Sequence, residues 1–204
     1  MADEPTVFVV DDDQNARDSV CFLVRSMGIQ AVAFPSAEEF LRQYQERSPG
    51  CLVTDVRMLG MSGIELQERL NEQGVTLPVI VLTAYARTRL TVRAMAAGAV
   101  TLLEKPYDED ELWDAIRKAL ARDAQRHCED ERQREIRDCF QQLTPGERDV
   151  MKMIVQGEPN KLIAKKLGIT IRGVEKRRSS VFSKMQAGSV AHLVRLVIEA
   201  RLDE

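Results

Sequence analysis

Three acidic side chains follow the first apolar segment of the chain. The segment Val7–Val10 is VFVV, and Asp11, Asp12 and Asp13 come directly after it. Carboxylates 4 Å apart repel one another by about 4 kcal/mol per pair at an effective dielectric constant of 20, so they need a counter-charge or a shared proton. Oxygen ligands of this kind suit Mg²⁺, which takes one or two carboxylates and keeps waters that a phosphate can displace. The acids therefore predict a magnesium site that attracts a phosphoryl group.

Three more polar side chains stand near the ends of later apolar runs. Asp55 follows CLVT, Thr83 follows VIVL, and Lys105 comes shortly after VTLL. Once a metal ion is bound, phosphoryl transfer depends mainly on positioning and on neutralisation of charge. Asp55 is the expected nucleophile and would form an acyl phosphate, while Lys105 and Thr83 would contact phosphoryl oxygens. Each residue alone is compatible with a helix cap, a strand position or a solvated charge, but their order along the chain favours the functional interpretation.

The first 120 residues alternate short β-branched runs with stretches of helical period. The expected strands are residues 7–10, 31–34, 51–54, 79–82 and 100–103. Helix starts are indicated where Glu follows a Ser or Asp by three residues, at Ser36, Ser62 and Asp108. This alternation predicts an α/β doubly wound, five-stranded parallel sheet with helices on both faces. Ligands bind such sheets outside the carboxyl ends of the strands, where the acids, Thr83 and Lys105 fall.

Residues 108–142 form one expected long helix without Gly or Pro. Its start has apolar residues at helical spacing, and its second half is strongly polar. A solvated connecting helix and a weak dimerising coil are both compatible with this pattern, although no sustained heptad runs from Leu120 to Ile136. We expect three parts: a first domain at 1–122, a helical linker at 123–142 and a second domain at 143–204.

The two expected domains differ in charge. Residues 143–204 carry twelve Lys and Arg against seven Asp and Glu, a net +5, whereas residues 1–142 carry 17 against 25, a net −8. The second domain starts a helix with Thr144, Pro145 and Glu147 at the N-cap, N1 and N3 positions. Two further helices, within NKLIAKKLGIT and IRGVEKRRSSVFSKM, are joined by a Gly-containing turn. This is the layout of an all-α helix-turn-helix domain, and its basic charge favours binding to double-stranded DNA.

The second of these helices has two distinct faces. Val174, Val181 and Met185 repeat at apolar spacing and are expected to face the core. The opposite face is expected to enter the major groove and carries Arg172, Lys176, Ser179 and Ser183, flanked by Glu175 and Ser180. Contacts to DNA phosphates are expected from Lys161, Lys165, Lys166, Arg177, Arg178 and Lys184.

Composition excludes several classes of protein. No apolar run approaches eighteen residues and the N-terminus is acidic, so we expect a cytoplasmic protein without a membrane span or signal peptide. Cys21, Cys51, Cys128 and Cys139 have no C-x-x-C spacing, which argues against structural zinc. Cys21 and Cys51 lie in apolar contexts and are expected to be buried thiols.

With these motifs in place, residues 5–122 resemble the receiver domain of two-component response regulators. The resemblance lies in VVDDD, TDVRMLGMSG, LTAYA and EKP, while residues 143–204 resemble the NarL/FixJ (LuxR-type) output domain. The resemblance implies strand order 2-1-3-4-5, a cis Lys105–Pro106 bond and phosphorylation of Asp55 by a sensor histidine kinase. It also implies Mg²⁺ bound by Asp11, Asp12, Asp55 and the carbonyl of Arg57, with Thr83 and Lys105 sensing the phosphoryl group.

Four residues depart from the family pattern. Leu59 stands where these regulators commonly have Pro, and Leu102 stands where many have a Tyr or Phe that turns inward when the threonine moves. Gly173 and Arg177 stand where the output family usually has Thr and His. A leucine cannot report by aromatic rotamer exchange, so we expect the switch to use backbone and packing changes instead.

The sequence thus predicts a transcription regulator, not an enzyme, in which phosphorylation of Asp55 favours homodimerisation and promoter binding. One alternative is a phosphorylation-independent DNA-binding protein whose first domain serves only to dimerise. The other is an Mg²⁺-dependent phosphohydrolase, but such an enzyme usually has a second acid two residues after the nucleophile, where this chain has Arg57.

Overall fold

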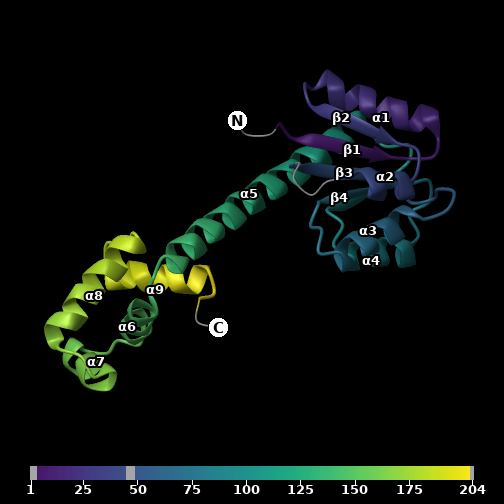
Figure 1. Cartoon of the computed structure of the whole chain (residues 1–204). Coiled ribbons are helices and arrows are strands. Elements are labelled where there is room, and N and C mark those ends of the chain that lie inside the picture. The colour runs from purple at the N-terminus through teal and green to yellow at the C-terminus, as the bar shows by residue number, and fades with distance from the viewer. Residues whose placement is uncertain (1–3, 45–48, 203–204) are drawn as a thin grey trace. The chain divides into compact units, whose positions relative to one another are not determined.

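The computed structural model describes residues 4–44 and 49–202 (Figure 1). The chain divides into two compact units, Met1–His127 and Cys128–Glu204. The boundary falls inside the long helix α5 (Glu109–Gln141), where the sequence predicted one helix over 108–142.

The N-terminal unit is built on a five-stranded parallel sheet (Figure 1). Its strands follow the order β2-β1-β3-β4-β5, which confirms the predicted topology. Each strand lies within a residue or two of its predicted position. The strands are β1 (Thr6–Val10), β2 (Gln30–Phe34), β3 (Gly50–Asp55), β4 (Val79–Thr83) and β5 (Thr101–Glu104).

Helices cover both faces of the sheet, because alternate residues of its central strands point to opposite faces and both sets are apolar. The helices are α1 (Gln14–Ser26), α2 (Ala37–Gln43), α3 (Gly63–Glu72) and α4 (Thr88–Ala96). Phe8 and Val10 of β1 belong to the core under α2, α3 and α4, and Val7 and Val9 to the core under α1 and the start of α5. The fold is therefore the predicted doubly wound α/β type.

Of the three predicted helix starts, two have a side-chain cap from the predicted residue, Ser36 and Ser62. Ser62 and Glu65 form a complete capping box at α3. The Ser36 hydroxyl accepts the amide of Glu39 at 3.2 Å, but the Glu39 carboxylate accepts a hydrogen bond from Gln43 rather than turning back to the cap. At α5, the contribution of Asp108 is its backbone carbonyl, which accepts the amide of Leu112 at 3.2 Å.

The C-terminal unit is all-helical in its described part. It contains the end of α5 and the helices α6 (Pro145–Val155), α7 (Asn160–Leu167), α8 (Ile171–Lys184) and α9 (Val190–Glu199). Gly168, with φ +65°, ends α7 in the left-handed conformation, and the Thr170 hydroxyl caps α8 by accepting the amide of Gly173 at 3.1 Å. The α7–turn–α8 segment is therefore the predicted helix-turn-helix.

The prediction for the two cysteines in apolar contexts is confirmed. Cys21 and Cys51 are buried, and burial raises the pKa of both thiols.

Within residues 4–44 and 49–202, no helix combines the length and apolar character that crossing a membrane requires.

Candidate functional site

A lysine bridges two carboxylates at one edge of the sheet. The Nζ atom of Lys105 lies 2.6 Å from Oδ1 of Asp55 and 3.0 Å from Oδ2 of Asp11. Both acids are buried, and the lysine side chain is 27% exposed. Lys105 is therefore the counter-charge that clustered acids require, and one of its faces remains open to solvent.

The parallel sheet brings these residues together from distant parts of the sequence. Asp55 is the last residue of β3, and Asp11 follows β1, whose Val10 is paired with Thr54. The backbone amide of Lys105 donates to the carbonyl of Thr83 at 2.7 Å. The carboxyl ends of β1, β3, β4 and β5 thus meet at this edge, as the sequence predicted.

Burial and hydrogen bonding compete in setting the charges here. Burial raises the pKa of Asp11, and the Asp13 amide and Lys105 only partly offset this effect. Burial alone would lower the pKa of Lys105, but its bonds to Asp55 and Asp11 outweigh burial and raise it. Lys105 therefore keeps its positive charge, and the combined negative charge of Asp11 and Asp55 exceeds it.

The other two acids after β1 have separate roles. The Asp13 carboxylate caps α1 by accepting the amide of Ala16 at 2.9 Å. Oδ2 of Asp12 accepts the amide of Leu59 at 2.9 Å, from the loop after β3. In the part of the chain that the structure describes, no three Asp, Glu, His or Cys side chains are arranged as a metal cluster.

Arg57 and Thr83 both contact Tyr85, in the loop that follows β4. The Arg57 amide donates to Oδ2 of Asp55 at 2.6 Å, and its guanidinium carbon lies 5.5 Å from the centroid of the Tyr85 ring. The buried Thr83 hydroxyl pairs with the backbone of Tyr85, donating to its carbonyl and accepting from its amide, each at 3.2 Å. Leu102 is half-buried and packs against the core under α2 to α4.

A second candidate surface lies on α8. Val174, Val181 and Met185 are buried, as predicted, and hold one side of the helix in the core. Several polar side chains of α8 are exposed and have no hydrogen bond or ion pair among the described residues. These are Arg172, Glu175, Lys176, Ser179 and Ser183. The exposed side chains of Lys161 and Lys165 lie on the neighbouring α7.

Lys184 has partners within the output domain that the sequence did not predict. Its ammonium lies 2.7 Å from Oε2 of Glu147 and donates to the carbonyl of Gln142 at 3.1 Å. The same Glu147 accepts from the Ser180 hydroxyl at 2.6 Å and from the Thr144 amide at 2.8 Å. Lys184 therefore ties α8 to α6 inside the domain, and its expected phosphate contact stays a prediction.

Three more of the predicted phosphate contacts are partly engaged within the domain. The Arg178 guanidinium lies over the Phe182 ring, 5.3 Å from its centroid, and also bonds Asn160. Arg177 is half-buried against Gly146, where a Cβ would lie 2.8 Å from its Nη1 atom. Lys166 forms an ion pair with Glu158.

Comparison with known proteins identifies the family of each domain. Residues 7–117 match the response regulator receiver domain, and residues 141–197 match the luxR family of bacterial regulatory proteins. The chain belongs to the two-component response regulators. Its receiver is followed by a LuxR-type helix-turn-helix output domain, which makes it a phosphorylation-controlled transcription regulator by family and not a classical enzyme.

The similarity to known response regulators covers nearly the whole length of this chain. The transcriptional regulatory protein FixJ of Azorhizobium caulinodans is 40% identical over 98% of this chain and 95% of its own. The regulatory protein TdiR of Thauera aromatica is 36% identical, over 95% of this chain and 85% of its own. The low-resolution structure of the response regulator StyR has a TM-score of 0.87 at 41% identity, covering 96% of this chain and 99% of that one. Full-length FixJ from B. japonicum has a TM-score of 0.59 at 38% identity, covering 98% of each chain.

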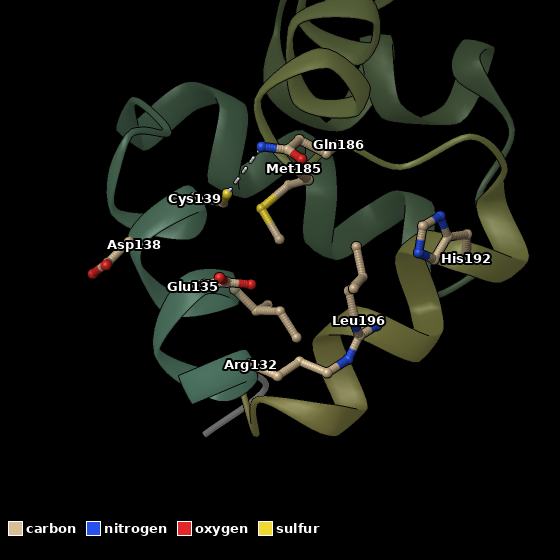
Figure 2. A pocket seen from close by; sticks show the side chains of 9 residues that line it. Arg132, Glu135, Asp138, Cys139, Met185, Gln186, His192 and Leu196 are labelled. Atoms are coloured by element: carbon tan, nitrogen blue, oxygen red, sulfur yellow. Dashed lines mark hydrogen bonds between the residues drawn. The ribbon is translucent and has the colours of Figure 1, made fainter. Parts of the chain in front are cut away.

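The output domain also contains a cavity of about 510 Å³ between the end of α5 and α9 (Figure 2). Ile136, Met185 and Leu196 give it apolar walls, while charged side chains such as Arg132 lie at its edge. None of the residues predicted to contact DNA lines it. The cavity is therefore separate from the candidate DNA-binding residues.

Sequence reasoning missed the contacts that fix loops and helices around the sites. It identified Glu147 as a cap residue but not as the partner of Lys184, and it did not identify Glu38, whose Oε1 accepts the Met61 amide at 3.0 Å. The capping spacing of Glu147 was a signal for the first contact. No local pattern indicates the second, because the partners lie on different elements.

Proposed function

We propose that this response regulator accepts a phosphoryl group on Asp55 from a sensor histidine kinase in the cytoplasm, and that phosphorylation controls promoter binding through α8. The observation that carries the proposal is the contact of Lys105 with both Asp55 and Asp11 at the carboxyl edge of the sheet. A cation already in contact with the nucleophile would pair with an incoming phosphoryl oxygen. Thr83 would contact another oxygen once its hydroxyl leaves the Tyr85 backbone.

The donor set fits the Mg²⁺ ion that receiver domains generally use. Asp11, Asp12, Asp55 and the carbonyl of Arg57 are all oxygen donors, which this hard cation prefers. Bound there, Mg²⁺ would neutralise charge on the phosphoryl group. Asp55 would bond to phosphorus as the phosphorus–nitrogen bond of the kinase phosphohistidine breaks, and the histidine would keep that electron pair.

Intact-protein mass spectrometry with MgCl₂ and a small acyl phosphate donor tests the phosphoacceptor. We expect one phosphoryl adduct on the wild type and none on Asp55→Asn. An equal adduct on both proteins would place the phosphoacceptor elsewhere. No adduct on the wild type at any Mg²⁺ concentration would favour the phosphorylation-independent alternative.

We propose that α8 enters the major groove of promoter DNA, with Arg172, Glu175, Lys176 and Ser179 toward the bases. Arg and Lys suit guanine, and a carboxylate can accept from the amino group of cytosine. Lys161, Lys165, Arg177 and Arg178 would contact phosphates, which position the helix without selecting sequence. Replacing Lys176 by Ala should change the sequence selected from a random duplex library, whereas replacing Lys161 should weaken binding to all sequences alike; the same effect from both would contradict this division.

Dimerisation on phosphorylation is part of the proposal. Two copies binding two half-sites would gain affinity by avidity without new contacts to DNA. Light scattering of the full chain with and without a phosphodonor should show an increase from monomer to dimer mass. A dimer of equal stability in both conditions would support the alternative in which the receiver only dimerises.

A further inference from the structure

In the loop after β3, the backbone amides of residues 57, 59 and 61 each donate a hydrogen bond to a carboxylate. The Arg57 amide donates to Asp55, the Leu59 amide to Asp12 and the Met61 amide to Glu38, at 2.6, 2.9 and 3.0 Å. These three acids come from β3, the β1–α1 loop and α2. The backbone of residues 57–61 is thus fixed at three points, and two of the three points are acids of the proposed metal site.

The middle point depends on Leu59, a residue that departs from the family pattern. Response regulators commonly have proline where this chain has Leu59, and proline has no backbone N–H to donate. The Leu59 side chain is 83% exposed, so its amide rather than its side chain connects it to the rest of the receiver. The bond to Asp12 is therefore a contact that the common residue could not make.

This bond involves Asp12, the acid of the proposed metal site that does not contact Lys105. Lys105 contacts Asp11 and Asp55, whereas Asp12 is exposed and its side-chain contact is with the Leu59 amide. In this arrangement the three acids do not form a metal cluster among the described residues. A cation that uses Asp12 must draw its carboxylate toward the other two and compete with the amide for it.

We propose that the Leu59 amide is a positioning group for Asp12 that lowers the affinity of the receiver for Mg²⁺, an inference that rests on the proposed function of the site. Without cation, the amide stabilises the Asp12 carboxylate and ties it to the β3–α3 loop. Cation binding takes the carboxylate and frees the amide, so the loop loses its middle attachment. Metal occupancy is thereby coupled to the conformation of residues 57–61.

Titration of the full chain with MgCl₂, followed through amide NMR signals near Asp55, tests the inference without any phosphorylation. Replacing the Leu59 peptide bond by an ester removes only the N–H, and Leu59→Pro removes it by a natural substitution. Both changes should lower the Kd for Mg²⁺ roughly three- to tenfold, as expected for an exposed charge-assisted hydrogen bond. Leu59→Ala keeps the amide and should keep the wild-type Kd. An ester variant that binds Mg²⁺ no more tightly than the wild type would overturn the inference.

Two controls separate failure of the inference from failure of the metal site. Asp12→Asn should weaken Mg²⁺ binding strongly; if it binds like the wild type, or if the wild type shows no saturable binding, the metal site itself is wrong. Hydrogen exchange gives an independent readout, because saturating Mg²⁺ should accelerate exchange of the Leu59 amide in the wild type. Unchanged or slower exchange would contradict release of the amide, even if the variants alter Kd.

Discussion

Each domain contains a lysine paired with buried acid, and the two clusters differ in charge balance. In the receiver, Lys105 faces both Asp11 and Asp55, so one positive charge meets two negative ones. In the output domain, Lys184 faces Glu147 alone, and that carboxylate also receives bonds from Ser180 and Thr144. The lysines are similarly exposed, at 27% and 32% of their side chains.

This difference separates a site from a structural contact. A cluster with surplus negative charge gains from another cation, whereas a balanced and fully hydrogen-bonded pair does not. Distances do not distinguish the two clusters, because the closest contact of Lys105 is 2.6 Å and that of Lys184 is 2.7 Å. The comparison therefore makes opposite predictions for removing an acid in the two domains.

The largest effect on stability is expected from Glu147→Gln. The change leaves the half-buried Lys184 without its acid and should lower the unfolding free energy of the output domain by about 2 kcal/mol. Hydrogen exchange of the most protected α8 amides measures this value. Asp149→Asn is the control, because Asp149 lies on the exposed side of α6, the helix that carries Glu147. This change should alter the unfolding free energy by less than about 0.5 kcal/mol. Equal effects of the two changes would mean that the pair contributes nothing.

A similar effect should appear as acid sensitivity of the output domain. Hydrogen bonds from Lys184, Ser180 and the Thr144 amide lower the pKa of Glu147 to about 2, below the 4.5 expected for the unfolded chain. Between these values the unfolded state binds more protons, so stability decreases as the pH falls from 4.5 toward 2. The wild type should lose about 2 kcal/mol more than Glu147→Gln over this range. Parallel pH profiles of α8 exchange in the two proteins would refute the assignment.

A smaller effect is expected from Mg²⁺, and only in the receiver. At tenfold its Kd, a ligand that binds only the folded state stabilises by about 1.4 kcal/mol. Slower hydrogen exchange in β1 and β3 should report this gain, while α8 should not respond. Asp12→Asn should remove most of the gain, and stabilisation of both domains would indicate a general salt effect instead.

The smallest effect is expected from Asp55→Asn. Lys105 would then pair with Asp11 alone, which balances the charge, so the receiver should change in stability by less than about 1 kcal/mol in the absence of Mg²⁺. Exchange of the β3 amides provides the measurement. A loss of 2 kcal/mol or more would show that Asp55 is a structural residue like Glu147.

Residues that depend on local pattern could be predicted from the sequence. The five strands and the residues at their carboxyl ends follow from apolar runs and from the geometry of parallel sheets, which places Asp11, Asp55 and Lys105 at one edge. The core side of α8 follows from helical period in the same way.

Contacts between helices, strands and loops that are far apart in the sequence could not be predicted. The sequence did not show that Lys184 pairs with Glu147, because the two residues are 37 positions apart and meet only when α6 packs on α8. Asp12 and Asp13 are neighbours of similar chemistry, yet one accepts the Leu59 amide and the other caps α1. Such choices depend on loop positions that no sequence period specifies.

The central claim is that phosphorylation of Asp55 controls binding of α8 to DNA. The most direct measurement is the affinity of the full chain for its selected duplex, with and without acyl phosphate and MgCl₂, beside Asp55→Asn. We expect the donor to increase the affinity of the wild type for DNA and to leave that of Asp55→Asn unchanged. Wild-type affinity that does not respond to the donor would contradict it.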